Sequence, residues 1–207
     1  MKYVELRTHS AFSFGDGAVS PEGLAVAAAG LGFESLGHND NADLVGIVRF
    51  THEARRMNIR PIIVVELKVD GHPAAFLART KEGFTNLGAL VTRARAGKLA
   101  GWKKGQNKLT RGRPGISWNE LAERSAGIHA LTGPASGKIA SLIDAENYGL
   151  ASRELAKWRE VFGERLAVEV QMHNTGGREA ALASALIDLA NKNFCRWVVT
   201  HDPRYVD

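Results

Sequence analysis

The sequence is poor in cysteine and has no long apolar run. Its 207 residues include one cysteine, Cys195, which excludes a disulfide framework and a zinc site built from several cysteines. No apolar stretch approaches the roughly 18 residues of a membrane-spanning helix, and residues 1–5 lack the apolar core of a secretion signal. We therefore expect a cytoplasmic chain without membrane contact. The length suffices to bury a core in one domain, residues 1–207.

Acidic residues are absent from one stretch of the chain. The sequence has 27 basic and 22 acidic residues, a formal net charge of +5. Eight basic residues fall between positions 93 and 113 with no acidic residue among them: Arg93, Arg95, Lys98, Lys103, Lys104, Lys108, Arg111 and Arg113. Without these eight, 19 basic residues face 22 acidic ones. The segment at about 95–114 is rich in glycine and has no apolar period, so we expect an exposed basic loop.

Two interpretations of this loop remain open. In the first, it follows a phosphate backbone without reading bases, and Trp102 stacks on a base. The residues that would contact phosphates are Lys103, Lys104, Lys108, Arg111 and Arg113. The predicted partner is then single-stranded DNA or another nucleic acid. In the second, the loop is a solvated insertion whose charges aid solubility.

Strand and helix patterns alternate along most of the chain. Alternating or β-branched runs predict seven strands, at residues 3–9, 35–37, 61–69, 72–79, 127–133, 166–173 and 196–202. Apolar spacing and capping signals predict helices at 21–29, 44–57, 81–94, 136–144, 149–162 and 178–192, and Ser117 with Glu120 forms a further capping box. This order is typical of an α/β fold with a largely parallel sheet. Such a sheet is either open or closed into a barrel.

Polar residues stand at or near the ends of five of these strands. They are His9, Asp40, Glu66, His173 and Asp202. Active sites of α/β barrels assemble at strand ends, which favours the barrel. Arg7 shares a strand face with His9, and Asp16 lies in the following loop. Donors of this kind suit Mn²⁺, Zn²⁺ or iron, which can activate water at a phosphoryl group. The alternative is that they cap helices, pair with arginines or face solvent.

Six stretches, in order along the chain, resemble one known family. They are LRTHS at 6–10, FSFGDG at 12–17, LVGIVRF at 44–50, RPIIVVEL at 60–67, LARTKEGFTNL at 77–87 and VTHDPRY at 199–205. The resemblance is to the polymerase and histidinol phosphatase (PHP) domain at the N-terminus of bacterial C-family DNA polymerases. It implies a distorted seven-stranded βα barrel. It also implies up to three metal ions and phosphoester hydrolysis, in polymerases as a 3′–5′ exonuclease.

The metal ligands of the family are only partly present. The resemblance places ligands at His9, Asp16, Asp40, Glu66 and Asp202. From its place at a strand end, His173, or else His201, could supply a further ligand. Four further ligand positions carry residues that do not fit: Arg7, Asn41, Pro134 and Arg204. A further family histidine falls near His72. Because arginine is permanently cationic and cannot coordinate a metal, we expect Arg7 and Arg204 to pair with the remaining carboxylates.

Two functions follow from the resemblance. The first is a structural or nucleic-acid-associated module of DNA replication or repair with a degenerate metal site, working with polymerase or repair proteins. The alternative is a metal-dependent phosphoesterase or 3′–5′ exonuclease that binds one Mn²⁺, Zn²⁺ or Mg²⁺ ion. Its catalytic residues would be Arg7, His9 and Asp202, with Arg7 stabilising charge on the phosphoryl group. Polymerase chemistry is not expected, because the sequence ends at Asp207.

Overall fold

The computed structural model describes residues 3–100, 114–173 and 175–206, without the side chains of 97–100. The strands in these ranges are β1 (Glu5–Thr8), β2 (Ser35–Asn41), β3 (Arg60–Val69), β4 (His72–Ala78), β5 (Gly115–Ile116), β6 (Ile128–Leu131), β7 (Leu166–Gln171) and β8 (Arg196–Thr200). The α-helices are α1 (Pro21–Gly30), α2 (Ile47–Arg56), α3 (Lys81–Ala100), α4 (Trp118–Glu123), α5 (Lys138–Asp144), α6 (Tyr148–Phe162) and α7 (Gly177–Lys192).

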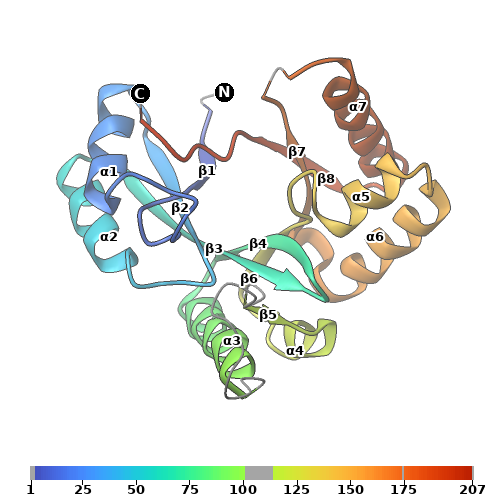
Figure 1. Cartoon of the computed structure of the whole chain (residues 1–207), viewed down its shortest axis with the longest axis horizontal. Coiled ribbons are helices and arrows are strands. Elements are labelled where there is room, and N and C mark those ends of the chain that lie inside the picture. Colours follow the sequence, from blue (N-terminus) through green and yellow to red (C-terminus); the bar gives the residue numbers. More distant parts are fainter. Residues whose placement is uncertain (1–2, 101–113, 174, 207) are drawn as a thin grey trace.

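The sheet curls into a half-barrel with its helices outside (Figure 1). Its strand order is β1-β2-β3-β4-β6-β7-β8, and β5 pairs with β3. All pairings are parallel except those of β4, which runs antiparallel to β3 and β6. The segment after β8 returns across the open side of the half-barrel towards β1 and α1 (Figure 1). The predicted α/β fold with a largely parallel sheet is confirmed.

Several local signals produce the predicted elements. Asp70 and Gly71 both have positive φ, 48° and 89°, as a tight two-residue hairpin between β3 and β4 requires. The Ser20 hydroxyl accepts a hydrogen bond from the amide of Gly23 at 3.0 Å, and Pro21 starts α1. The predicted capping box of Ser117 and Glu120 is present at the start of α4. These ends are decided within a few residues of sequence.

Two predicted boundaries differ most from the structure. β2 does not end near residue 37 but continues to Asn41, because its polar residues are buried and stay paired with β3. α3 does not end near residue 94 but continues to Ala100. Arg93 and Arg95, predicted as part of an unopposed basic stretch, pair with Glu120 and Asp43. The predicted loop residues Lys103, Lys104, Lys108, Arg111 and Arg113 lie outside the described ranges.

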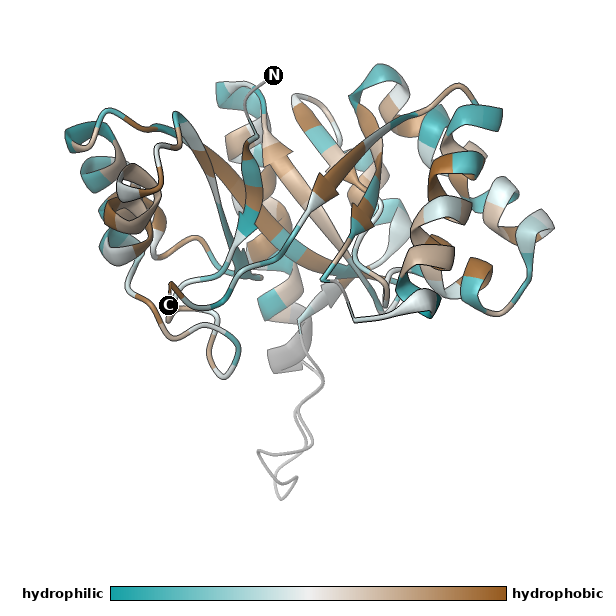
Figure 2. Cartoon of the chain, turned by 90° about the horizontal axis from the view of Figure 1, so that it is seen from above, coloured by the Kyte–Doolittle hydropathy of each residue, from teal (hydrophilic) through white to brown (hydrophobic). Residues whose placement is uncertain are grey.

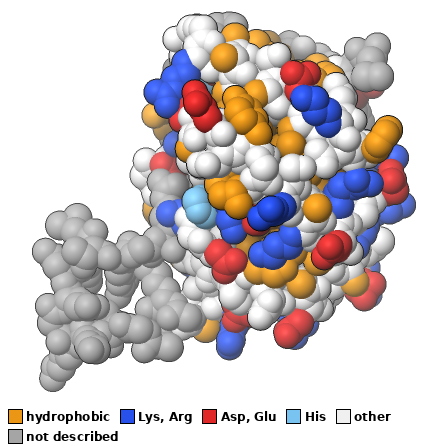
Figure 3. Space-filling view, turned by 90° about the vertical axis from the view of Figure 1, so that its right-hand side faces the viewer, with side chains coloured by type: hydrophobic (Ala, Val, Ile, Leu, Met, Phe, Trp, Pro, Cys, Tyr) orange, Lys and Arg blue, Asp and Glu red, His pale blue; other side chains and the backbone are white. Residues whose placement is uncertain are grey.

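The main hydrophobic core lies between the outer face of the sheet and the helices α3 to α7. A second cluster joins α1, α2 and β2. Figure 2 shows apolar strands flanked by helices whose outer faces are hydrophilic. On the face formed by α5, α6 and α7, charges of both signs surround hydrophobic side chains (Figure 3). Within the described ranges no helix combines the length and apolar character needed to cross a bilayer.

The inner face of the half-barrel changes character along the strands. Its buried apolar layer consists of Val64, Ala75 and Leu131, with partly buried hydrophobic side chains around it. Towards the carboxyl ends of the strands this layer gives way to buried charged and polar residues. The fold therefore gathers polar chemistry at one end of the half-barrel, which is the end predicted from the sequence.

Candidate functional site

Arg7 lies at the centre of a group of carboxylates. It stands on β1, and its side chain is 0% exposed. Its guanidinium forms ion pairs with Glu66 on β3, with Glu169 on β7 at 3.0 Å, and with Asp202 after β8 at 3.7 Å. One side chain thus connects strands from both halves of the sheet. We call Arg7, Glu66, Glu169 and Asp202 the Arg7 cluster.

The charges of the cluster shift one another's ionisation. Burial alone would lower the pKa of Arg7, but the carboxylates of Glu169, Glu66 and Asp202 outweigh burial and raise it. Burial also works against ionised Asp202, yet a hydrogen bond from His9 and the charge of Arg7 lower the pKa of Asp202 to about 2. Burial raises the pKa of Glu169 despite Arg7 and a hydrogen bond from Thr200. The cluster is therefore held by a charged guanidinium and an ionised Asp202.

His9 joins this cluster to a second group of polar residues. Its Nε2 lies 2.7 Å from Asp202 Oδ1, and its Nδ1 lies 3.0 Å from the hydroxyl of Ser13. Ser13 donates to Asp40 at 2.7 Å, and the amide and hydroxyl of Ser10 donate to the same carboxylate at 2.9 and 2.8 Å. Asp40 is completely buried. Serine hydroxyls and a backbone amide therefore surround Asp40.

Arg204 closes the outer side of the site. Its guanidinium donates to Asp16 at 3.3 Å and to Asp202 at 3.1 Å. The side-chain amide of Asn41 donates to the other carboxylate oxygen of Asp16. The predicted pairing of Arg7 and Arg204 with the remaining carboxylates is confirmed by these contacts. Three of the four positions that lack a family ligand, 7, 41 and 204, thus interact with a candidate ligand.

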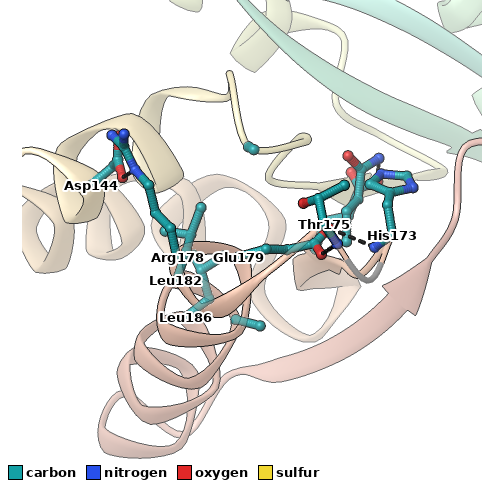
Figure 4. Close-up of a pocket in the computed structure, with 11 residues that line it drawn as sticks. Asp144, His173, Thr175, Arg178, Glu179, Leu182 and Leu186 are labelled. Carbon is teal, nitrogen blue, oxygen red and sulfur yellow. Dashed lines mark hydrogen bonds and ion pairs between the residues drawn. The ribbon is translucent and has the colours of Figure 1, made fainter.

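His173 lies apart from the Arg7 cluster. Its side chain is exposed, and its backbone amide donates to Glu179 at the start of α7 (Figure 4). It lines a cavity of about 470 Å³ together with Gln171, Thr175 and Arg178, whose guanidinium is paired with Asp144. Glu169 borders the same cavity. The cavity therefore borders one residue of the cluster.

The residues present do not fit a metal ion. Among the residues that the structure describes, no three His, Cys, Asp or Glu side chains are placed to hold one ion. The space among Glu66, Glu169 and Asp202 is taken by the Arg7 guanidinium, which has no lone pair to offer a metal. The ligand role predicted for His9, Asp16, Asp40, Glu66, His173 and Asp202 stays a prediction.

Sequence reasoning missed Glu169 as a site residue. It stands in the middle of β7, is 1% exposed, and accepts from both Arg7 and Thr200. The available signal was an acidic residue inside the otherwise apolar strand LAVEVQ, since a buried charge needs a partner. Ser10 and Ser13 were missed for a different reason. Serines in a loop carry no sign that they surround a buried carboxylate.

Comparisons with known proteins agree on one family. The PHP domain family profile matches residues 5–173. An error-prone DNA polymerase of Anaeromyxobacter sp. (strain K) is 35% identical over 190 residues, covering 89% of this chain and 15% of the relative. A DNA polymerase III subunit alpha of Pseudomonas aeruginosa is 32% identical over 214 residues, covering 100% of this chain and 17% of the relative. The chain thus spans about a sixth of the length of these relatives.

Solved structures share the fold at low sequence identity. An amidohydrolase from Chromobacterium violaceum with bound sulfate and no metal superposes with a TM-score of 0.67 at 18% identity, covering 98% of this chain and 88% of the other. A protein from Bifidobacterium adolescentis assigned as a metal-dependent phosphoesterase gives a TM-score of 0.63 at 13% identity, covering 98% and 87%. At these identities the likeness concerns the fold alone.

Proposed function

The chain belongs to the PHP domain family, and from this premise we propose that it is a metal-free structural module of DNA replication or repair. In this proposal the ion cluster of the family has been replaced by ion pairs centred on Arg7 and Arg204. The module holds a polymerase-type assembly together and contacts nucleic acid. It does not hydrolyse phosphoesters.

The single observation that carries the proposal is the burial of Arg7 among three carboxylates. A fixed cation at that point pairs with Glu66, Glu169 and Asp202, where bound metal ions would otherwise lie. A guanidinium supplies charge and directed hydrogen bonds. It supplies neither an open coordination position nor an activated water, which metal-dependent hydrolysis requires. The site is therefore suited to stability and not to turnover.

Metal analysis tests this proposal. The wild type is loaded with Mn²⁺ or Zn²⁺, freed of excess ion and measured by elemental analysis. We expect no stoichiometric metal in the wild type. A triple variant Arg7→His, Asn41→His and Arg204→His, which restores three family ligand positions, is expected to bind metal. Stoichiometric metal in the wild type that disappears in His9→Ala would overturn the proposal.

A nuclease assay covers the alternative function. Release of 3′ nucleotides with added Mn²⁺ is measured for the wild type, His9→Ala and Asp202→Asn. The proposal expects no release that depends on His9 or Asp202. Release by the wild type that both substitutions abolish would establish the phosphoesterase instead.

The nucleic-acid part of the proposal rests on the basic residues of the segment at 95–114. Neutralising Lys103, Lys104, Lys108 and Arg111 together is expected to weaken binding to any single strand and to reduce its salt dependence, because fewer counterions are released. Fluorescence anisotropy of a labelled single strand at two salt concentrations measures both. Equal affinity of the two proteins would exclude this segment as a binding element.

A further inference from the structure

The turn between α7 and β8 has an unusual residue at its central position. The amide of Phe194 donates to the carbonyl of Asn191 at 3.1 Å, and the amide of Cys195 donates to that of Ala190 at 2.9 Å. These two bonds define a Schellman motif, and Phe194 occupies its left-handed position with φ of 50°. Glycine is preferred there, because a side chain in this conformation costs about 1 kcal/mol or more.

Three other helices of the protein end in the same motif with other residues at that position. α1 ends with Gly32, α2 with Asn58 and α5 with Glu146, each with the two characteristic amide-to-carbonyl bonds. Glycine and asparagine are the usual occupants of this position. Glutamate shares the strained backbone, but its carboxylate is polar and is solvated by water. Phenylalanine is the costliest choice of the four, because it combines the strained backbone with an aromatic side chain that gains little burial.

Phe194 is also the most exposed of the large hydrophobic residues that the structure describes. It is 89% exposed, and Trp197, three residues later at the start of β8, is 44% exposed. Placing an aromatic ring in water on a strained backbone lowers stability twice over. Strain and apolar exposure at one residue are typical of a contact site and not of a residue kept for the fold.

The residues around Phe194 carry positive charge. The strip Lys192–Trp197 contains Lys192 and Arg196 and no acidic residue. Arg196 pairs with Glu164 at 3.2 Å, with both side chains more than two thirds exposed, so water screens this pair and another anion can replace it. Within the described part of the chain Lys192 has no ion-pair partner. The exposed ring of Phe194 thus stands in the chain between two accessible cations, Lys192 and Arg196.

We propose that the strip Lys192–Trp197 is a contact site for single-stranded nucleic acid, in which Phe194 stacks on a base and Lys192 and Arg196 lie along the phosphates. Every base has a π face, so such a platform binds without reading sequence. This site belongs to the nucleic-acid association of the proposed function and adds a second element to it. It lies at the start of β8, whereas the Arg7 cluster lies at the carboxyl ends of the strands.

The choice between nucleic acid and a protein partner rests on the pattern of the strip. An aromatic anchor for a protein pocket lies at the centre of a well-packed patch with a rim matched to one partner. Here an exposed ring stands between two cations, Lys192 and Arg196, which suits a base between two phosphates of a strand. If the protein does not bind oligonucleotides, the exposed ring of Phe194 is better explained as a contact for a protein partner, and the proposal is overturned.

The decisive variant is Phe194→Gly. Glycine relieves the strained backbone, so we expect the melting temperature to stay level or rise. The affinity for a labelled oligothymidylate of about 15 nucleotides, followed by fluorescence anisotropy, is expected to fall roughly 5- to 100-fold. Glu146→Gly is the matched control, because it makes the same backbone change without removing a ring. It is expected to gain similar stability and to keep the wild-type affinity. Phe194→Tyr is expected to retain binding.

The outcomes separate this site from the proposed function. If the wild type binds and Phe194→Gly binds equally well, the strip is not a contact site, although nucleic-acid association still stands through the basic segment. If the wild type binds no oligonucleotide, both the proposed contact site and the proposed nucleic-acid association are wrong. The metal analysis still tests, independently, whether the Arg7 cluster is metal-free. Loss of binding in Phe194→Gly alone, with Glu146→Gly unchanged, supports the strip.

Discussion

At the scale of single residues, Arg7 illustrates how one side chain can hold several strands together. Its guanidinium has five N–H donors in a rigid plane, and carboxylates on β3, on β7 and after β8 surround it. Removing such a residue leaves the buried carboxylate of Glu169 and the half-buried ones of Glu66 and Asp202 without their common cation. The cost of the substitution therefore comes mainly from what remains behind.

Arg7→Met is expected to lower the free energy of unfolding by about 3–5 kcal/mol, because it breaks a buried ion-pair network from one side. Chemical denaturation measures this change. Arg178→Met is the control, since Arg178 pairs with Asp144 through two hydrogen bonds but is 84% exposed. Its loss should cost no more than about 1 kcal/mol. Equal effects of the two substitutions would contradict the central role of Arg7.

His129 gives the protein a pH dependence of known sign. Burial, followed by the charges of Arg79 and Arg165, lowers its pKa below the ordinary value of 6.5. The unfolded chain then binds a proton that the folded protein does not bind between the lowered pKa and 6.5. Stability is therefore expected to fall as the pH drops below 6.5, and by a small amount, because water screens this partly exposed ring.

Denaturation of the wild type and His129→Gln across pH 4 to 7 isolates this contribution. The two stability curves are expected to run parallel at neutral pH and to converge or cross as the pH falls. Curves that stay parallel throughout the range would show that the two states of His129 do not differ in proton affinity.

At the scale of elements, α3 crosses the turn before β6 closely because Gly83 on the helix lies against Gly127 in the turn. A Cβ added at Gly83 would lie 1.9 Å from the carbonyl oxygen of Gly127, whereas one added at Gly88 on the same helix would meet nothing within 4 Å. The first position thus permits backbone-to-backbone contact, and the second has no steric need for glycine.

The two positions predict opposite effects of the same substitution. Gly83→Ala is expected to destabilise the protein by roughly 1–3 kcal/mol, because the helix must move away from Gly127. Gly88→Ala is expected to stabilise it by about 0.5–1 kcal/mol through helix propensity. Thermal unfolding of both variants measures the difference. A loss of stability in both would mean that α3 is more tightly enclosed than its contacts indicate.

Most elements could be predicted because their signals are local. Pro21 after Ser20, the Ser117–Glu120 box and the Asp70-Gly71 turn each act within four residues. The end of β2 could not be predicted in this way. The polar stretch 38–41 is typical of a loop, and it is a strand because its backbone pairs with β3 and because Ser10 and Ser13 donate hydrogen bonds to the buried carboxylate of Asp40.

At the scale of the whole molecule, side chains close the seam that strand pairing leaves open. β1 and β8 lie at the two ends of the described sheet order. Glu5 on β1 accepts hydrogen bonds from the amide of Arg7 at 2.8 Å and from the amide of His201, just after β8, at 2.9 Å. The amide of His9 donates to the carbonyl of Pro203 at 3.1 Å. These contacts and Arg7 join the two ends of the half-barrel.

Glu5→Ala is expected to loosen this seam, because a buried amide left without an acceptor costs about 1–3 kcal/mol. Hydrogen exchange should accelerate at Arg7 and His201 and remain slow at Val65 in the central strand β3. Glu179→Ala is the control, since Glu179 also accepts from two amides but outside the seam. Its effect should stay near residues 173 and 175. Uniformly faster exchange in Glu5→Ala would indicate global destabilisation and no separate seam.

The amino-acid sequence alone was enough to predict the alternating strands and helices, the polar residues at the strand ends and the resemblance to the PHP family. These depend on short-range periodicity, capping and motifs, which act between residues close in the chain. The identity of the charge partners required the folded structure. Arg7 meets Glu169 across 162 positions and Arg204 meets Asp16 across 188, and no local pattern encodes such distant pairs. The curl of the sheet brings them together, and burial then makes each charge depend on its partner.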